Sequence, residues 1–109
     1  MHGDLDKLIA FVTAHFPFDE NVYPELKGAD EKQRFLFAVR HSAIHFAKTA
    51  GKIAAVSEDA DHGDDIDTEK LKENVPKALI NTLRLAELLG MSEKDLTRAI
   101  EEKYKNNIE

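Results

Sequence analysis

The chain of 109 residues contains no cysteine. This absence excludes disulfide frameworks, thiol nucleophiles and zinc sites built from cysteine. The chain also lacks any run of about 18 apolar residues, so no segment is expected to span a membrane. Its first residues, MHGDLDKLIAFV, carry acids where a signal peptide carries basic residues. We therefore expect a cytoplasmic protein.

Positive charge is scarce, because 15 lysines and arginines are outnumbered by 21 acidic residues and the net charge is −6. Direct binding of nucleic acid needs a basic surface, so it is not expected. No P-loop and no GxGxxG motif occurs. Ser42, Ser57 and Ser92 have no GxSxG context, so no serine nucleophile is indicated.

The composition, 42% hydrophobic and 33% charged, is typical of a soluble globular protein rich in helix. The length predicts a single domain over residues 1–109. A protomer of this size buries only a modest core, and oligomerisation would add to it.

Apolar residues recur at helical spacing, and the sequence predicts four helices near residues 4–15, 31–57, 68–89 and 92–106. Asp30, Asp67 or Thr68, and Ser92 are the expected N-caps of the last three. Pro76 predicts a kink or a later start in the third helix. No strand is indicated, so we expect an all-α fold with two long antiparallel helices. The second helix carries one apolar stripe, formed by Phe35, Val39, Ser42, Phe46, Ala50 and Ile53.

A cationic line follows another face of the second helix. His41, His45, Lys48 and Lys52 lie within about 60° of one another, and Arg34 falls on the same line. The third helix has a matching polar line, made of Lys70, Lys77, Asn81 and Arg84. Lysine and arginine suit phosphate better than they suit a metal cation, so the two lines predict an anion site. The alternative is that both lines are solvated faces.

A weaker candidate for a metal site follows the lysines. Glu58, Asp61 and His62 are close in sequence, and carboxylates of this kind bind Mg²⁺ or Mn²⁺. A Zn²⁺ or Ni²⁺ site would use His41 and His45 with a distant acid. His45 and Glu58 are roughly 20 Å apart along one helix, so one protomer cannot join them but an antiparallel dimer could. The alternative is a solvated acidic loop.

The C-terminal half resembles a known family. The segment KALINTLRLAELLGMSEKDLTRAIEEKYKNN carries Leu85, Ala86, Leu89 and Gly90, a short turn, and then Lys103 and Asn107. It looks like the end of the MazG-like all-α nucleoside triphosphate pyrophosphohydrolases, and the resemblance covers residues 31–107. It implies a four-helix architecture that forms a dimeric bundle. It also implies nucleotide contacts from Lys103 and Asn107.

The chain departs from that family where the family binds Mg²⁺. The family has Glu-x-x-Glu on the long helix and Glu-x-x-Asp on the next, whereas this chain has RHSAIH and NVPK, with Asn74 and Lys77 in place of the acids. Three alternative hypotheses follow. In the first, the protein binds a nucleotide or another phosphorylated ligand without hydrolysing it. In the second, it is an active enzyme with Mg²⁺, Mn²⁺ or Zn²⁺ at a metal site relocated to His41, His45, Glu58, Asp61 and His62. In the third, it is a structural or regulatory helical dimer.

A second apolar line on the long helix bears on assembly. Phe37 and Ile44 lie outside the main stripe and are seven residues apart. Such a line suits a partner helix, so we expect a homodimer through the two long helices, with further association open.

Overall fold

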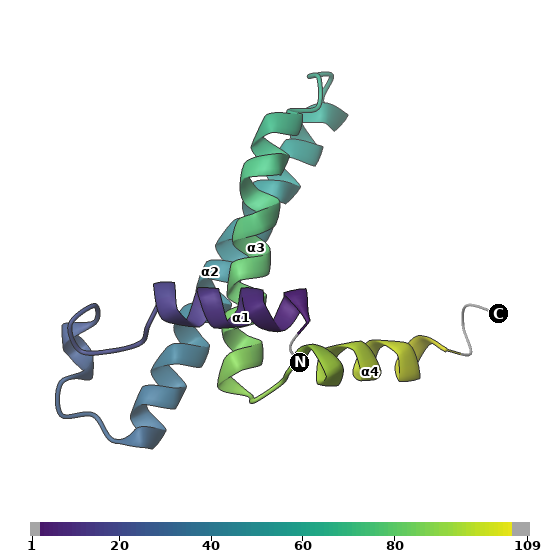
Figure 1. The fold of residues 1–109 in the computed structure, drawn as a ribbon. Helices are drawn as coiled ribbons and strands as arrows, with labels where there is room; N and C mark the ends of the chain where they lie inside the picture. The colour runs from purple at the N-terminus through teal and green to yellow at the C-terminus, as the bar shows by residue number, and fades with distance from the viewer. Residues whose placement is uncertain (1–2, 106–109) are drawn as a thin grey trace.

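The computed structural model describes residues 3–105 and is entirely helical (Figure 1). Its elements are α1 (Asp4–His15), a 3-10 turn η1 (Pro24–Leu26), α2 (Glu31–Asp61), α3 (Thr68–Leu88) and α4 (Glu93–Tyr104). No strand occurs between residues 3 and 105, and the predicted all-α class is confirmed. Asn107 and the end predicted for the last helix, residue 106, lie outside the described residues.

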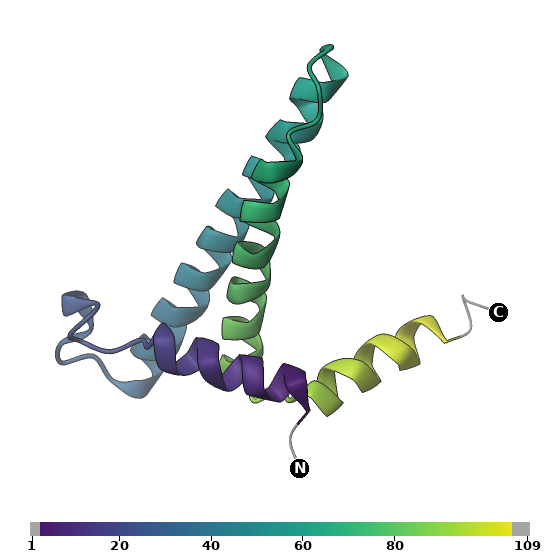
Figure 2. The ribbon, with the colours of Figure 1, turned by 45° about the horizontal axis from the view of Figure 1, so that its top comes forward.

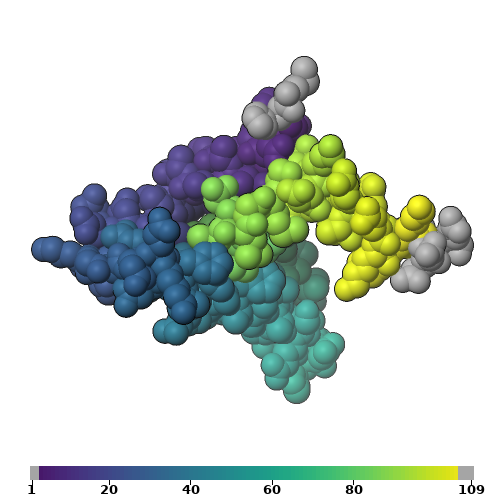
Figure 3. Space-filling model, turned by 90° about the horizontal axis from the view of Figure 1, so that it is seen from below, coloured from purple at the N-terminus to yellow at the C-terminus, as the bar shows by residue number. Residues whose placement is uncertain are grey.

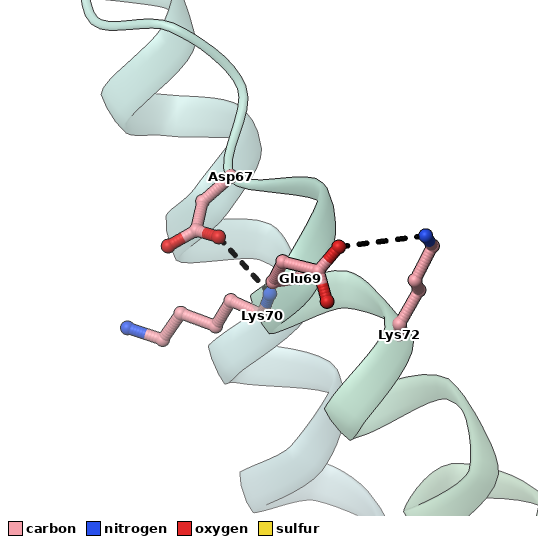
Figure 4. Close-up of polar contacts among 4 residues, drawn as sticks. All are labelled: Asp67, Glu69, Lys70 and Lys72. Carbon is pink, nitrogen blue, oxygen red and sulfur yellow. Dashed lines mark hydrogen bonds and ion pairs between the residues drawn. The ribbon is translucent and has the colours of Figure 1, made fainter.

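Side-chain caps start three of the helices where the sequence predicts them. Asp30 and Ser92 each form a capping box, with Gln33 and Asp95 respectively. Asp67 accepts a hydrogen bond of 3.0 Å from the amide of Lys70 at the start of α3 (Figure 4). Each cap satisfies a backbone donor that the first helical turn leaves unpaired.

The helix α2 ends four residues later than predicted, at Asp61 rather than at residue 57. No glycine or proline lies between Ser57 and Asp61, so nothing in this segment breaks the helix. Gly63, with φ of 101°, follows the helix end, in the left-handed region that favours glycine. The later start suggested by Pro76 is wrong, because α3 begins at Thr68 and continues through that residue.

The two long helices form an antiparallel hairpin that stands above the rest of the molecule. In both ribbon views α2 and α3 lie side by side, α1 crosses the base of the hairpin, and α4 projects away from it (Figures 1 and 2). The buried core is small and lies where α1 meets α3, around Ile9, Val12 and Leu83. No helix within residues 3–105 is long and apolar enough to cross a membrane.

The contact between α2 and α3 differs from the predicted apolar stripe. The buried residues of α2 are Ala38, Ser42, Thr49 and Val56, so of the predicted stripe only Ser42 is fully buried. Small side chains let two helices approach closely, and they therefore line the contact. The bulky rings of the stripe are rotated outward and exposed.

The starts of α1 and α4 are joined at the base of the molecule. The Glu93 carboxylate accepts a 3.0 Å hydrogen bond from the amide of Leu5, and the Asp6 carboxylate accepts one of 2.8 Å from the amide of Glu93. Each helix therefore supplies an anionic cap to the other, which the helix dipoles favour. A methyl group on Gly3 would meet the Glu93 carboxylate, so this side chain, which accepts from Leu5, would have to shift to make room for a larger residue.

Candidate functional site

The segment between α1 and α2 wraps aromatic rings around the base of the hairpin. Phe18 and Tyr23 come from this segment, and Phe37 and His41 come from α2. Neighbouring ring centroids in the group are 4.9 to 6.4 Å apart. Aromatic pairs at such separations attract one another beyond the area they bury. The cluster fixes the position of the His41 ring.

A chain of polar contacts joins the two long helices across this cluster. Arg84 of α3 donates from Nη2 to the backbone oxygen of Phe16 at 3.2 Å and to the Tyr23 hydroxyl at 3.4 Å. The Tyr23 oxygen lies 3.2 Å from His41 Nε2. Since a guanidinium only donates, the hydroxyl proton of Tyr23 is free to point at His41, whose Nε2 then accepts.

Arg84 is the most unusual residue of the site. It is 7% exposed, and its guanidinium carbon lies 4.0 Å from the centre of the Phe18 ring. Its Nε has no hydrogen-bond partner, and no carboxylate within residues 3–105 forms an ion pair with it. A buried cation without a counter-ion is costly unless an anion joins it. Arg84 also lines a hollow of about 220 Å³ with Phe16 and Phe18.

The two histidines of the predicted line are adjacent, and their ring centroids are 4.4 Å apart. Burial lowers the pKa of His41 below its usual value of 6.5, and the nearby His45 and Arg84 lower it further, whereas Glu25 acts in the opposite direction. His41 is therefore neutral at neutral pH, in agreement with a ring nitrogen that accepts from Tyr23.

This shift predicts a dependence of stability on pH. The folded protein resists protonation of His41, while the unfolded chain takes up the proton near pH 6.5. The contribution of His41 to stability is therefore fully present above that pH and is lost as the pH falls below it. We expect the melting temperature of His41→Phe to depend less on pH between about 7.5 and 5.5 than that of the wild type. Thermal melts across this range measure the difference.

The control is His62→Gln, because the His62 side chain is 76% exposed at the end of α2. This variant should keep the pH dependence of the wild type. A wild-type slope in His41→Phe would contradict the assignment.

The lysines of the predicted lines lie higher on the hairpin than Arg84. Lys48 and Lys52 are exposed on α2, one and two turns beyond His45. Lys77 lies two turns from Arg84 on the same face of α3, and its ammonium contacts Glu73 at 3.3 Å. The hairpin therefore presents a cationic face with the half-buried His41 and the buried Arg84 at its base and exposed lysines above them.

Of the two C-terminal candidates the structure describes Lys103, and this residue is not part of the cationic face. Lys103 lies on α4, which projects away from the hairpin in the space-filling view from below (Figure 3). Its ammonium lies 5.6 Å from the centre of the neighbouring Tyr104 ring. The structure therefore does not bring Lys103 to the hairpin of its own chain.

The weaker metal candidates lie at the far end of α2. Glu58 and His62 approach within 4.0 Å, and with Asp61 they are exposed to solvent. In the part of the chain that the structure describes, no three histidine or acidic side chains gather closely enough to hold an ion. Because α2 is continuous from His45 to Glu58, these two residues lie about 20 Å apart, as predicted from their spacing.

The aromatic half of the site was not predicted from the sequence. The segment 16–24 reads as a loop because of its prolines, yet it contributes Phe16, Phe18 and Tyr23. Three aromatic residues in a short loop are the signal that could have indicated a packed segment.

Comparisons of the chain with models of protein families, with curated proteins and with solved structures found no match. The class of the protein is therefore defined by its own fold, an all-α hairpin with two flanking helices and a cationic, aromatic site at its base.

Proposed function

We propose that this protein is a divergent MazG-like protein that binds the phosphate groups of a nucleotide or another phosphorylated small molecule on the cationic face of its hairpin. The observation that carries the proposal is the guanidinium of Arg84, which is buried, has no carboxylate partner within residues 3–105 and is linked through Tyr23 to His41. A phosphate would supply the missing counter-ion, because its oxygens accept several charge-assisted hydrogen bonds at once.

The order of the helices supports the MazG-like part of the proposal. A long helix, a short turn, a second long helix ending before Gly90 and a shorter last helix follow one another in residues 31–104. This is the order that the resemblance implies. The proposal includes assembly of at least two copies through the long helices, because the single copy leaves much apolar surface exposed.

The residues at the family's acidic positions do not fit a bound Mg²⁺. Asn74 is buried, and its side-chain nitrogen donates to the backbone oxygen of Lys70 at 2.8 Å. Lys77 adds a positive charge one turn further on. A hard divalent cation prefers several carboxylate oxygens, and here it would meet an amide and an ammonium. We therefore propose ligand binding without metal-dependent hydrolysis.

Titration calorimetry with pyrophosphate and with ATP tests the proposal. In EDTA both should bind and adenosine should not, and Mg²⁺ should not tighten the binding, because it complexes the same phosphate oxygens that the cationic face would hold. Turnover of ATP that requires a metal would favour the alternative, an enzyme with a relocated site. An absence of binding by every probe would leave the cationic face as a solvated surface.

Lys77 should make a measurable contribution to that affinity. We expect Lys77→Ala to weaken pyrophosphate binding about fivefold, or about 1 kcal/mol. The loss should be no larger, because the Lys77 ammonium is half-exposed and already pairs with the Glu73 carboxylate. Calorimetry at low salt measures this change.

Lys72→Ala is the matched control for Lys77. Lys72 lies on the same helix and pairs with Glu69 at 3.4 Å, but it points to the opposite side of α3 from Lys70 (Figure 4). By helical geometry this side is also away from Lys77 and Arg84. It should bind pyrophosphate as the wild type does. Equal losses in the two variants would indicate a general charge effect and not a site.

A further inference from the structure

The hollow of about 220 Å³ beside Arg84 lies where the end of α1 meets the last turns of α3. Phe16, Pro17 and Phe18 line it from the chain that leaves α1, and Leu88 lines it from α3. These four side chains carry no hydrogen-bonding group. Pockets for drug-sized ligands occupy about 300–1,000 Å³, so this hollow suits a small ligand or one part of a larger one.

Arg84 supplies a positive charge to the wall of the hollow and is 7% exposed. Its Nη2 donates to the backbone oxygen of Phe16 and to the Tyr23 hydroxyl, but its Nε has no acceptor. A buried donor without a partner costs free energy, and an oxygen of a ligand would remove that cost. The guanidinium side of the hollow therefore suits an anionic group.

Glu87 supplies a negative charge to the same hollow, and its side chain is exposed. Within residues 3–105 its carboxylate forms no hydrogen bond and no ion pair. Residues three apart on a helix are neighbours, so Arg84 and Glu87 are placed to pair with each other. Because the guanidinium turns to Phe16 and Tyr23 instead, two opposite charges line one hollow without meeting.

Thr13 adds a hydrogen-bond acceptor to the hollow. Its hydroxyl donates to the backbone oxygen of Ile9 at 2.8 Å, so its oxygen lone pairs remain to accept. A primary ammonium has three N–H donors and no acceptor, and it therefore needs groups such as this hydroxyl and the Glu87 carboxylate. An aromatic ring such as that of Phe16 also attracts a cation.

We infer that the hollow selects phosphorylated ligands that also carry a primary ammonium, with the phosphate on Arg84 and the ammonium on Glu87 and Thr13. The inference rests on the proposed function, because it takes the guanidinium to hold the phosphate. A phosphate alone is attracted by Arg84 and repelled by Glu87, whereas a zwitterion complements both charges. A two-carbon link between the two groups is comparable with the spacing of about 5–6 Å between neighbours on a helix face.

Glu87 is thus a specificity-determining residue, and calorimetry with phosphoethanolamine and with ethyl phosphate tests this role. The two probes share a phosphate monoester on a two-carbon chain, and only the first has the ammonium. At neutral pH and low salt the wild type should bind phosphoethanolamine about fivefold more tightly. The preference should be no larger, because the Glu87 carboxylate is exposed.

Glu87→Gln should remove this preference and should bind ethyl phosphate at least as tightly as the wild type does, because the amide no longer repels the phosphate. The variant should stay helical by circular dichroism, since the exposed carboxylate makes no contact within residues 3–105. Glu69→Gln is the matched control. It removes the same charge from an exposed position on α3, about 27 Å along the helix from residue 87, and should keep the wild-type preference.

The failure of this inference can be distinguished from the failure of the proposed function. Equal binding of the two probes by a wild type that binds pyrophosphate would overturn the inference and leave the proposed function standing. A preference that Glu87→Gln retains, or that Glu69→Gln removes equally, would also overturn it. Binding of neither probe and no binding of pyrophosphate would refute both.

Discussion

Arg84→Met is expected to weaken pyrophosphate binding by about 100-fold, or roughly 3 kcal/mol, since hydrogen bonds to charged groups contribute about 1.5–3 kcal/mol each. Methionine replaces the apolar stem of the arginine but removes the guanidinium, which lies 4.0 Å from the centre of the Phe18 ring, and with it the charge. Calorimetry at neutral pH and low salt measures the loss. Arg84→Lys should also bind weakly, because an ammonium lacks the planar fork of the guanidinium.

The stability of Arg84→Met separates a binding role from a structural one. The variant loses the hydrogen bonds to Phe16 and Tyr23, but it also removes a buried charge that has no ion pair within residues 3–105. These effects oppose each other, so the free energy of unfolding should change by less than about 1.5 kcal/mol. The control is Arg98→Met on α4, which should change neither property. Unchanged phosphate affinity in Arg84→Met would refute the proposed site.

Ser42 gives the second large effect, because it is 0% exposed at the contact between α2 and α3. A leucine there has no space, so Ser42→Leu should destabilise the protein by about 2–3 kcal/mol through overpacking. Ser42→Ala should instead be neutral or stabilising by up to about 1 kcal/mol, because the Ser42 hydroxyl has no hydrogen-bond partner. Chemical denaturation monitored by circular dichroism measures both changes.

The sign of the stability change in Ser42→Ala is the informative outcome. A loss of more than about 1 kcal/mol would show that the hydroxyl makes a hydrogen bond, and it would contradict the packing of Ser42 in the contact between α2 and α3. Ser57→Ala is a suitable reference, because Ser57 is an exposed serine on the same helix.

The number, order and starts of the helices could be predicted from the sequence because local interactions determine them. Asp30, Asp67 and Ser92 cap the helices that follow, as their positions before apolar periodic segments indicate. The end of α2 was predicted less well, because an acidic segment reads as a loop although it contains no helix breaker before Gly63. Polarity alone does not end a helix when the chain has no residue that opposes it.

Which line of residues on α2 faces α3 could be decided only from the tertiary structure. The sequence indicates that His41 and His45 share a line and that Phe35 and Phe46 share another. It does not show which line faces α3, because the period of the helix is the same whichever side is buried. The small residues Ala38, Ser42 and Thr49 occupy that contact, so the phenylalanines are left exposed.

The sequence by itself determined that this protein is all-α, that its long helices carry cations on one line and apolar residues on another, and that it lacks the acids of the family it resembles. Periodicity and capping are local properties, and they can be read along the chain. Only the tertiary structure decided that Tyr23 joins His41 to Arg84 and that Arg84 is buried with no counter-ion among the described residues 3–105. These contacts span up to 61 residues of sequence, and packing between separate elements alone brings such residues together.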